Sequence, residues 1–443
     1  MSEQTSGLSP QRRADVLDAL RRGTVPHLGL DALAVGLGRF DEALTGELLG
    51  VKRGGSGFKA VRGEYGSGKT FFGRWLQEKA KKLGFATAEV QVSETETPLH
   101  QLGTVYRRLI ERLSTADTPT AAFRSVVDGW FFTLEQDVLA SEDVSDSDAA
   151  GLLERTNDLA ERRLSGISQR APAFAAGLRA YRRAQAEGNQ AIAEGMIAWL
   201  GGQPNVAAEV RRYALVKGEV DHYTAMGFLQ GLLVVLRDSG FAGLVLVLDE
   251  VETLQRVRSD VRDKGLNALR QLIDEVDGGV FPGLYIVVTG TPGFYDGPMG
   301  ATRLPPLAQR LHVDFSLEAR FDNPRAVQIR LPGFSRPLLE DVGRKVRDLF
   351  VEGAKEPSRL AVVDDAYVAL LASAVTGELG GKVGVAPRVF LKKLVAEVLD
   401  RVDQFPDFDP RRHYALTVSE GELTAQERSA RAARDPDEIE LES

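Results

Sequence analysis

The chain has 443 residues, which at roughly 150 residues per domain is enough for about two to three domains. With 43% hydrophobic and 27% charged residues it has the composition of a soluble globular protein, and the absence of cysteine excludes a disulfide framework, a zinc ribbon, an iron–sulfur site and a thiol nucleophile. The net charge of −8 is atypical of a dedicated nucleic-acid-binding protein, so any contact with DNA would need a local basic patch.

The N-terminal region is predicted to begin with a helix and to continue into a strand. Ser9 can cap this helix, Pro10 occupies its first position, and Gly23 ends it. A glycine-rich segment at 54–57 then leads into a short strand at 58–61. The sequence contains no signal-peptide pattern and no apolar run of roughly 20 residues that could span a bilayer, so we expect a cytoplasmic protein with no membrane partner.

The pattern Gly63-x-x-x-x-Gly68-Lys69-Thr70 follows that strand and precedes a predicted helix at 71–84. This is a Walker A motif, in which glycines allow backbone N–H groups to surround phosphates and the helix directs its positive end toward them. Lys69 is expected to reach the β- and γ-phosphates of ATP, and the Thr70 hydroxyl to bind Mg²⁺. The predicted nucleotide-binding residues are Gly63, Glu64, Tyr65, Gly66, Ser67, Gly68, Lys69, Thr70 and Phe71.

The remaining strands predict an α/β fold with a doubly wound parallel sheet. Residues 85–92 alternate apolar and polar side chains, which is typical of a half-buried strand near a sheet edge. The runs at 244–248 and 285–289 are continuously apolar and predict strands that are buried on both faces, while 327–331 gives a weaker signal. A helix is predicted at 263–277, so this part of the chain is expected to form a strand, a helix and two further strands.

The segment at 99–238 is too long for one crossover between strands and shows several apolar stripes at helical spacing. We therefore predict a large helical insertion. The whole division is an N-terminal helix and linker at 1–45, a core at 46–98 and 239–334, the insertion at 99–238, a helical lid at 335–405 and a tail at 406–443. Arginines of the insertion could contact DNA phosphates, although such clusters more often form solvated helix faces: Arg162, Arg163, Arg179, Arg182, Arg183, Arg211 and Arg212.

A second group of candidate residues follows the buried strand at 244–248. Two adjacent carboxylates at the carboxyl end of a strand are costly unless they face a ligand, so Asp249 is predicted to hold Mg²⁺ and Glu250 to act as the general base. The alternative is that one of them caps the following turn. Glu252 is expected to point elsewhere along an extended chain and to have a structural role.

Candidate sensor residues lie farther along the chain. Thr289 or Thr291, after the strand at 285–289, could contact the γ-phosphate or the attacking water, and formation of a turn explains them equally well. Arg310 and Arg388 could each stabilise charge on a transferring phosphoryl group, whereas an arginine considered alone is usually solvated or ion-paired.

With these residues, the chain resembles AAA+ ATPases of the Orc/Cdc6-like branch and, more narrowly, the BrxD family (DUF2791) of ATP-binding proteins from BREX bacteriophage-defence systems. The stretches that carry the resemblance are 12-RRADVLDALRRGTVPHLGLDALAVGLGRFDE-42, 59-KAVRGEYGSGKTFF-72, 98-PLHQLGTVYRRLIERL-113 and 240-GFAGLVLVLDEVETLQRVR-258. The resemblance covers most of residues 10–405. It implies that Gly36–Glu42 borders the adenine, that Thr289 is the first sensor, that Arg310 acts on the nucleotide of a neighbouring subunit, and that Arg388 is a second sensor from the lid.

The expected function is therefore that of a Mg²⁺-dependent ATPase in phage defence. Expected partners are other defence-system proteins, in a homo-oligomer or a mixed ATPase assembly, with DNA left open as a further ligand. The alternative is an assembly switch that binds ATP and seldom hydrolyses it, since the same motifs would serve both. A small-molecule kinase fits less well, because such enzymes are usually compact and this chain has a long insertion and a lid.

Overall fold

The protein is an α/β structure built on one parallel sheet, as the computed structural model shows for residues 8–141, 148–169, 171–378, 386–418, 421, 423 and 428. The five strands have the order β2-β3-β4-β1-β5, and all their pairings are parallel. The strands are β1 (Gly57–Arg62), β2 (Ala86–Gln91), β3 (Leu244–Asp249), β4 (Leu284–Gly290) and β5 (Gln328–Arg330). The predicted α/β class and parallel sheet are confirmed.

The burial of each strand follows from its sequence pattern. Every residue of β3 and β4 is buried, as expected for apolar strands covered on both faces. Strand β2 lies at one edge of the sheet and keeps polar side chains at Glu89 and Gln91, which confirms the interpretation of its alternating sequence.

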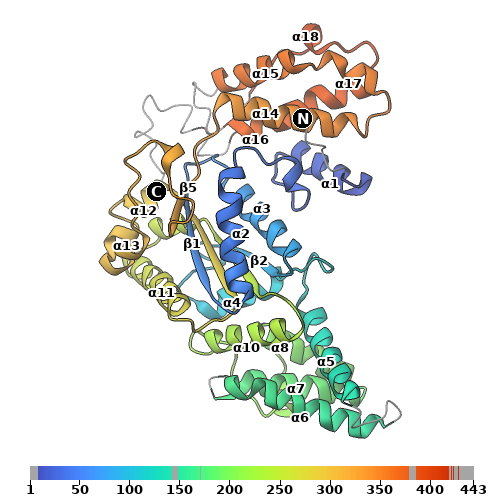
Figure 1. Ribbon diagram of the computed structural model, residues 1–443, viewed down its shortest axis with the longest axis vertical. Helices are drawn as coiled ribbons and strands as arrows, with labels where there is room; N and C mark the ends of the chain where they lie inside the picture. The colour runs from blue at the N-terminus through green and yellow to red at the C-terminus, as the bar shows by residue number, and fades with distance from the viewer. Residues whose placement is uncertain are drawn as a thin grey trace.

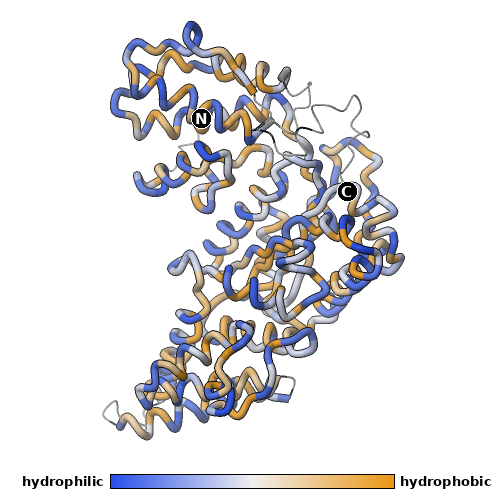
Figure 2. The backbone as a smooth tube through the Cα atoms, turned by 180° about the vertical axis from the view of Figure 1, so that it is seen from behind, coloured by the Kyte–Doolittle hydropathy of each residue, from blue (hydrophilic) through white to orange (hydrophobic). Residues whose placement is uncertain are grey.

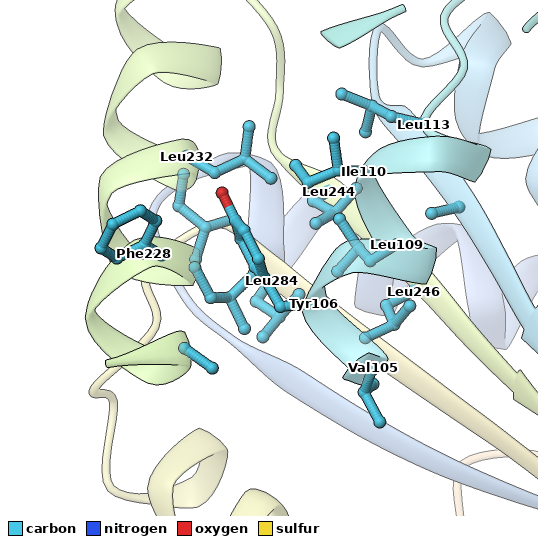
Figure 3. Close-up of a cluster of buried hydrophobic side chains, with 14 of the residues drawn as sticks. Val105, Tyr106, Leu109, Ile110, Leu113, Phe228, Leu232, Leu244, Leu246 and Leu284 are labelled. Atoms are coloured by element: carbon cyan, nitrogen blue, oxygen red, sulfur yellow. The ribbon is translucent and has the colours of Figure 1, made fainter. Parts of the chain in front are cut away.

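Helices cover both faces of the sheet (Figure 1). On one face, α2 (Gly38–Lys52) and α3 (Lys69–Lys82) pack against side chains such as Val245 and Val287. On the other, α4 (Leu102–Arg112), α10 (Ala225–Asp238) and α11 (Ser259–Asp277) pack against the alternate side chains of the same strands. Figure 3 shows Leu109 of α4 beside Leu246 of β3.

The region between β4 and β5 contains helices that the sequence did not predict. These are α12 (Pro292–Asp296) and α13 (Pro305–Leu311), with the 3₁₀ turns η3 (Ala301–Arg303) and η4 (Ala319–Phe321). Each of the two α-helices begins at a proline and has at most seven residues, which is too short for an apolar stripe to recur. The expectation that one strand follows the other directly was wrong.

Residues 99–238 are predominantly helical, as predicted. Besides α4 and α10 they form α5 (Phe123–Ala140), α6 (Ala149–Ser168), α7 (Pro172–Ala186), α8 (Gln190–Leu200) and α9 (Ala208–Tyr213). These helices share one apolar core with the sheet face beneath α4 and α10. Phe228 of α10 joins the two layers, because its ring lies 5.2 Å from that of Phe174, 5.4 Å from that of Trp199 and 5.8 Å from that of Tyr106.

Most arginines proposed as contacts for DNA phosphates have partners within the protein. Arg163 bonds to Asp137 and Asp238, Arg179 pairs with Glu161, and Arg182 pairs with Glu135. The Arg183 guanidinium lies 4.1 Å from the centre of the Tyr213 ring. These contacts favour the interpretation of the clusters as helix faces that the protein itself neutralises.

The C-terminal helices form a second apolar core with the N-terminal helix. They are α14 (Arg336–Val351), η5 (Pro357–Val362), α15 (Asp365–Glu378), α16 (Ala386–Lys392), a π-helical segment η7 (Lys393–Leu399), α17 (Asp400–Gln404) and α18 (Pro410–His413). Helix α1 (Pro10–Arg21), capped by Ser9 as predicted, buries Val16 and Leu20 in this core. Arg21 also makes two hydrogen bonds of 2.8 Å to Asp400.

Figure 2 shows the chain from behind, coloured by hydropathy. Hydrophobic and hydrophilic residues alternate along the helices above and below the sheet, as expected for helices with one buried face. No helix among the described residues combines the length and the apolar character needed to cross a membrane.

Candidate functional site

A cavity of about 340 Å³ lies at the carboxyl edge of the sheet, where the glycine loop at 63–70 faces the C-terminal helices α14 and α16. One end of its lining is polar and includes Tyr65, Gly66, Ser67, Gly68, Lys69, Thr70, Asp249, Glu250 and Glu252. The other end is largely apolar and includes Leu20, Val25, Pro26, Leu33, Val35, Leu37, Phe334, Leu338, Val342, Pro387 and Leu391. The cavity thus offers a polar end suited to phosphates and an apolar end suited to a flat base.

The glycine loop has a backbone that other residues would adopt only with strain. Gly66 and Gly68 have φ angles of 76° and 88°, in the left-handed region that favours glycine. A Cβ atom at Gly63 would overlap the Ser67 hydroxyl. Helix α3 begins at Lys69, so its N-terminus, which carries a partial positive charge, faces the cavity.

Thr70 and Asp249 are brought together at the polar end. The Thr70 hydroxyl donates a hydrogen bond of 2.9 Å to Asp249 Oδ2, and the Thr289 hydroxyl donates to Asp249 Oδ1. Asp249 is only 5% exposed, and this burial raises the pKa of its carboxyl despite the opposing effect of the two hydroxyls. A hydroxyl and a carboxylate beside the glycine loop form a donor set that fits Mg²⁺.

Glu250 adopts an unusual backbone conformation next to Asp249. Its φ of 63° lies in the left-handed region, and its backbone N–H donates to the Thr289 hydroxyl at 3.2 Å. Its carboxylate accepts a hydrogen bond of 2.8 Å from Gln91 Nε2, at the end of the neighbouring strand β2. Sequence reasoning missed Gln91; the signal was the polar end of an edge strand that pairs with β3, where Gln91 lies opposite Asp249.

Glu252 lies inside the site, so the expectation that it points elsewhere was wrong. After Glu250 the chain is not extended but turns into the 3₁₀ helix η2 (Val251–Gln255), which brings residue 252 back toward the loop. Its carboxylate is 3.8 Å from Lys69 Nζ and lines the cavity. Burial raises the pKa of Glu252 to about 7, although the Lys69 ammonium acts in the opposite direction.

Of the two threonines and two arginines predicted to act on the phosphates, Thr289 and Arg388 approach the cavity. Thr289 contacts Asp249, whereas Thr291 is buried at the start of α12 and does not line the cavity. Arg388 of α16 lines the cavity. Arg310 of α13 pairs with Asp274 of α11 and lies outside the cavity of its own chain.

The segment predicted to border a base lines the cavity only at its start. Gly36 and Leu37 contribute to the apolar end, while Arg39 turns away and donates to the backbone oxygens of Ala319 and Arg330. The rest of the apolar end comes from Leu20 to Val35 and from the lid. Sequence reasoning missed this contribution because the packing of α1 into the lid depends on contacts hundreds of residues apart.

A family model described as BREX system ATP-binding protein BrxC/D matches residues 8–418 of the chain. No curated protein and no solved structure matches the chain. The matched range includes the glycine loop, the carboxylates at the end of β3 and the C-terminal helices that line the cavity.

Proposed function

The chain belongs to the family of BREX system ATP-binding proteins BrxC/D, and from this premise we propose that it is a Mg²⁺-dependent AAA+ ATPase. The observation that carries the proposal is the 2.9 Å hydrogen bond between Thr70 and Asp249. It joins the helix after the glycine loop to the carboxyl end of β3, and these are the two groups that a P-loop ATPase uses to hold Mg²⁺.

In the proposed complex, the phosphates of ATP occupy the loop at 63–70 and the base occupies the apolar end of the cavity. Lys69 turns from the loop carbonyls to the β- and γ-phosphates, since a phosphate oxygen is the stronger acceptor. Thr70 and Asp249 hold Mg²⁺, which supplies neutralisation of charge on the phosphates.

Glu250 is the proposed general base, and Thr289, Arg388 and Arg310 are proposed to assist the reaction. Thr289 fixes both Asp249 and the backbone of Glu250, so we assign the sensor role to Thr289 and not to Thr291. Arg388 reaches the same cavity from the lid. Arg310, outside its own cavity, is proposed to act on the nucleotide of a neighbouring subunit.

The test is phosphate release with Mg²⁺ by the wild type and by Glu250→Gln. We expect the variant to bind ATP as the wild type does and to lose most of its turnover, because an amide cannot accept the proton of the attacking water. If the wild type shows no turnover with any BREX component or with DNA present, the hydrolysis proposal is wrong.

A second candidate is a nucleotide-gated assembly switch that hydrolyses ATP rarely. The bond between Gln91 and Glu250 favours it, because the carboxylate is held toward the sheet edge. Mass measurement of Glu250→Gln with and without ATP separates the two functions. Assembly that depends on ATP and persists in this variant supports the switch, and an unchanged mass and unchanged partner binding contradict it.

We further propose that hydrolysis or binding of ATP controls contacts with other BREX proteins, and that the helices at 99–238 provide part of those contacts. DNA binding through the paired arginines Arg163, Arg179 and Arg182 would require breaking ion pairs. A gel-shift titration at two salt concentrations tests for DNA contact, since phosphate contacts produce a steep dependence on salt.

A further inference from the structure

The ammonium group of Lys69 is held by several groups of the protein. Its Nζ donates to the backbone oxygens of Gly63 at 2.8 Å and Glu64 at 3.3 Å. The Glu252 carboxylate lies 3.8 Å away, and the centre of the Tyr65 ring lies 5.1 Å away. Lys69 is therefore folded back onto the loop that it is expected to leave when phosphate binds.

The three carboxylates around this site differ in their partners. Asp249 accepts hydrogen bonds from two hydroxyls, and Glu250 accepts one from an amide. Glu252 is 4% exposed, and its Oε2 atom is buried with no hydrogen-bond partner among the described residues. Lys69 is the cation that faces it.

An isolated buried carboxylate is costly, so the contact between Glu252 and Lys69 is strongly favoured while the cavity holds no other anion. The same carboxylate lines the cavity in which the proposed function places the phosphates. Anything that draws Lys69 toward a phosphate leaves Glu252 with less compensation and brings two negative groups close together.

We infer that Glu252 is a counter-charge latch: it holds Lys69 on the carbonyls of the glycine loop in the nucleotide-free protein and thereby weakens the binding of nucleoside triphosphates. The inference rests on the proposed function, because it concerns the same cavity. Glu252 acts through Lys69 and is a positioning residue.

The latch opposes ATP more than ADP. A triphosphate brings more negative charge to the polar end of the cavity and competes more directly for the Lys69 ammonium, which is expected to contact the γ-phosphate. Removing the charge of Glu252 should therefore increase the preference of the site for ATP.

The test measures the binding of fluorescent ATP and ADP analogues with Mg²⁺ to the full-length wild type and to Glu252→Gln at pH 8, above the Glu252 pKa of about 7, so that the wild-type carboxyl is ionised. Glutamine keeps the size of the side chain and removes its charge. We expect the dissociation constant of the ATP analogue to fall by about tenfold and that of the ADP analogue by about two- to threefold, the range for loss of one nearby buried charge. In steady-state assays KM should fall while kcat stays within about twofold.

Glu111→Gln is the matched control. Glu111 lies on α4, is paired with Arg108 at 2.9 Å and does not line the cavity. The Glu111→Gln variant should leave both dissociation constants nearly unchanged, and thermal unfolding should show that both variants are folded.

Three outcomes would overturn the latch. The ATP affinity of folded Glu252→Gln could equal or fall below that of the wild type, Glu111→Gln could have the same effect as Glu252→Gln, or kcat could fall with KM unchanged, which would make Glu252 a catalytic group. If the wild type itself binds neither analogue, the proposed function fails. Binding by the wild type with no gain in Glu252→Gln contradicts the latch alone.

Discussion

Gln91, the last residue of the edge strand β2, donates a hydrogen bond of 2.8 Å to the carboxylate of Glu250. This contact holds the proposed general base toward the edge of the sheet while the neighbouring Asp249 faces Thr70. The two adjacent carboxylates thus have different partners, and Glu250 itself has a left-handed backbone with a φ of 63°. A change at the edge strand can therefore alter the position of the base without touching the nucleotide.

We expect Gln91→Ala to raise kcat for ATP hydrolysis by about two- to tenfold, the scale of one hydrogen bond, because the freed carboxylate can turn into the cavity. The affinity for ATP should stay the same, since Gln91 does not line the cavity. Phosphate-release kinetics and analogue titration measure the two quantities. Gln77→Ala is the control. Gln77 lies on α3, the helix after the loop, and its side-chain amide donates a hydrogen bond to Glu89 of β2. A slower Gln91→Ala enzyme would mean that Gln91 supports the active position of Glu250.

The two arginines of the proposed site should differ in how their effects depend on protein concentration. Arg388 lines the cavity, so Arg388→Ala should weaken ATP binding by about tenfold in dilute protein, as expected for one charged contact. Arg310→Ala should leave this affinity unchanged and lower kcat only at concentrations at which subunits associate, because Arg310 lies outside its own cavity. Titration and turnover over a range of protein concentrations measure both. Weaker ATP binding by dilute Arg310→Ala would contradict the assignment in trans.

The parts of the fold that the sequence predicts are those with a local cause. The burial of β3 and β4 follows from their own apolar residues, and the geometry of the glycine loop follows from Gly66 and Gly68. The prediction that Glu252 points away from the site was wrong because the chain changes direction at Glu250. The left-handed φ of Glu250 has no signature in the sequence.

Other features depend on pairing between distant segments. Gln91 becomes part of the site only because β2 pairs in register with β3, which is about 160 residues away in the chain. Helix α1 was predicted, but its place in the lid core follows from contacts such as that between Arg21 and Asp400. A single sequence carries no information on such pairings beyond the general rule that neighbouring elements tend to pack together.

The continuous core predicts that damage to the helices at 99–238 destabilises the whole molecule. A methyl group at Gly231 of α10 would overlap the Phe174 ring, so Gly231→Ala should lower the free energy of unfolding by about 1–3 kcal/mol. Gly129→Ala in α5 is the matched control, because its methyl group would have no neighbour within 4 Å and alanine favours a helix.

Circular dichroism during thermal unfolding measures this effect. We expect one cooperative transition that moves to lower temperature in Gly231→Ala, with or without nucleotide, since Phe174 and Phe228 belong to the same cluster as Leu246 of the sheet. Two separate transitions could appear instead, of which only the one that nucleotide does not stabilise moves in Gly231→Ala. That result would show that the helices at 99–238 unfold independently of the sheet.

The buried carboxyl of Glu252 predicts how stability changes with pH in the nucleotide-free protein. Burial raises its pKa from an ordinary value of 4.5 to about 7, so folding favours the protonated form. The stability that this form contributes is fully present below pH 4.5 and is lost as the pH rises through 7. The side chain of residue 252 cannot ionise in Glu252→Gln. The free energy of unfolding of this variant, relative to that of the wild type, should therefore increase by about 3 kcal/mol between pH 4.5 and 8. Urea unfolding at several pH values measures the difference, with Glu111→Gln as the control for loss of one negative charge. A difference that is constant with pH would show that the Glu252 carboxyl ionises normally in the folded protein, and the cost of its burial would then be fully offset by Lys69.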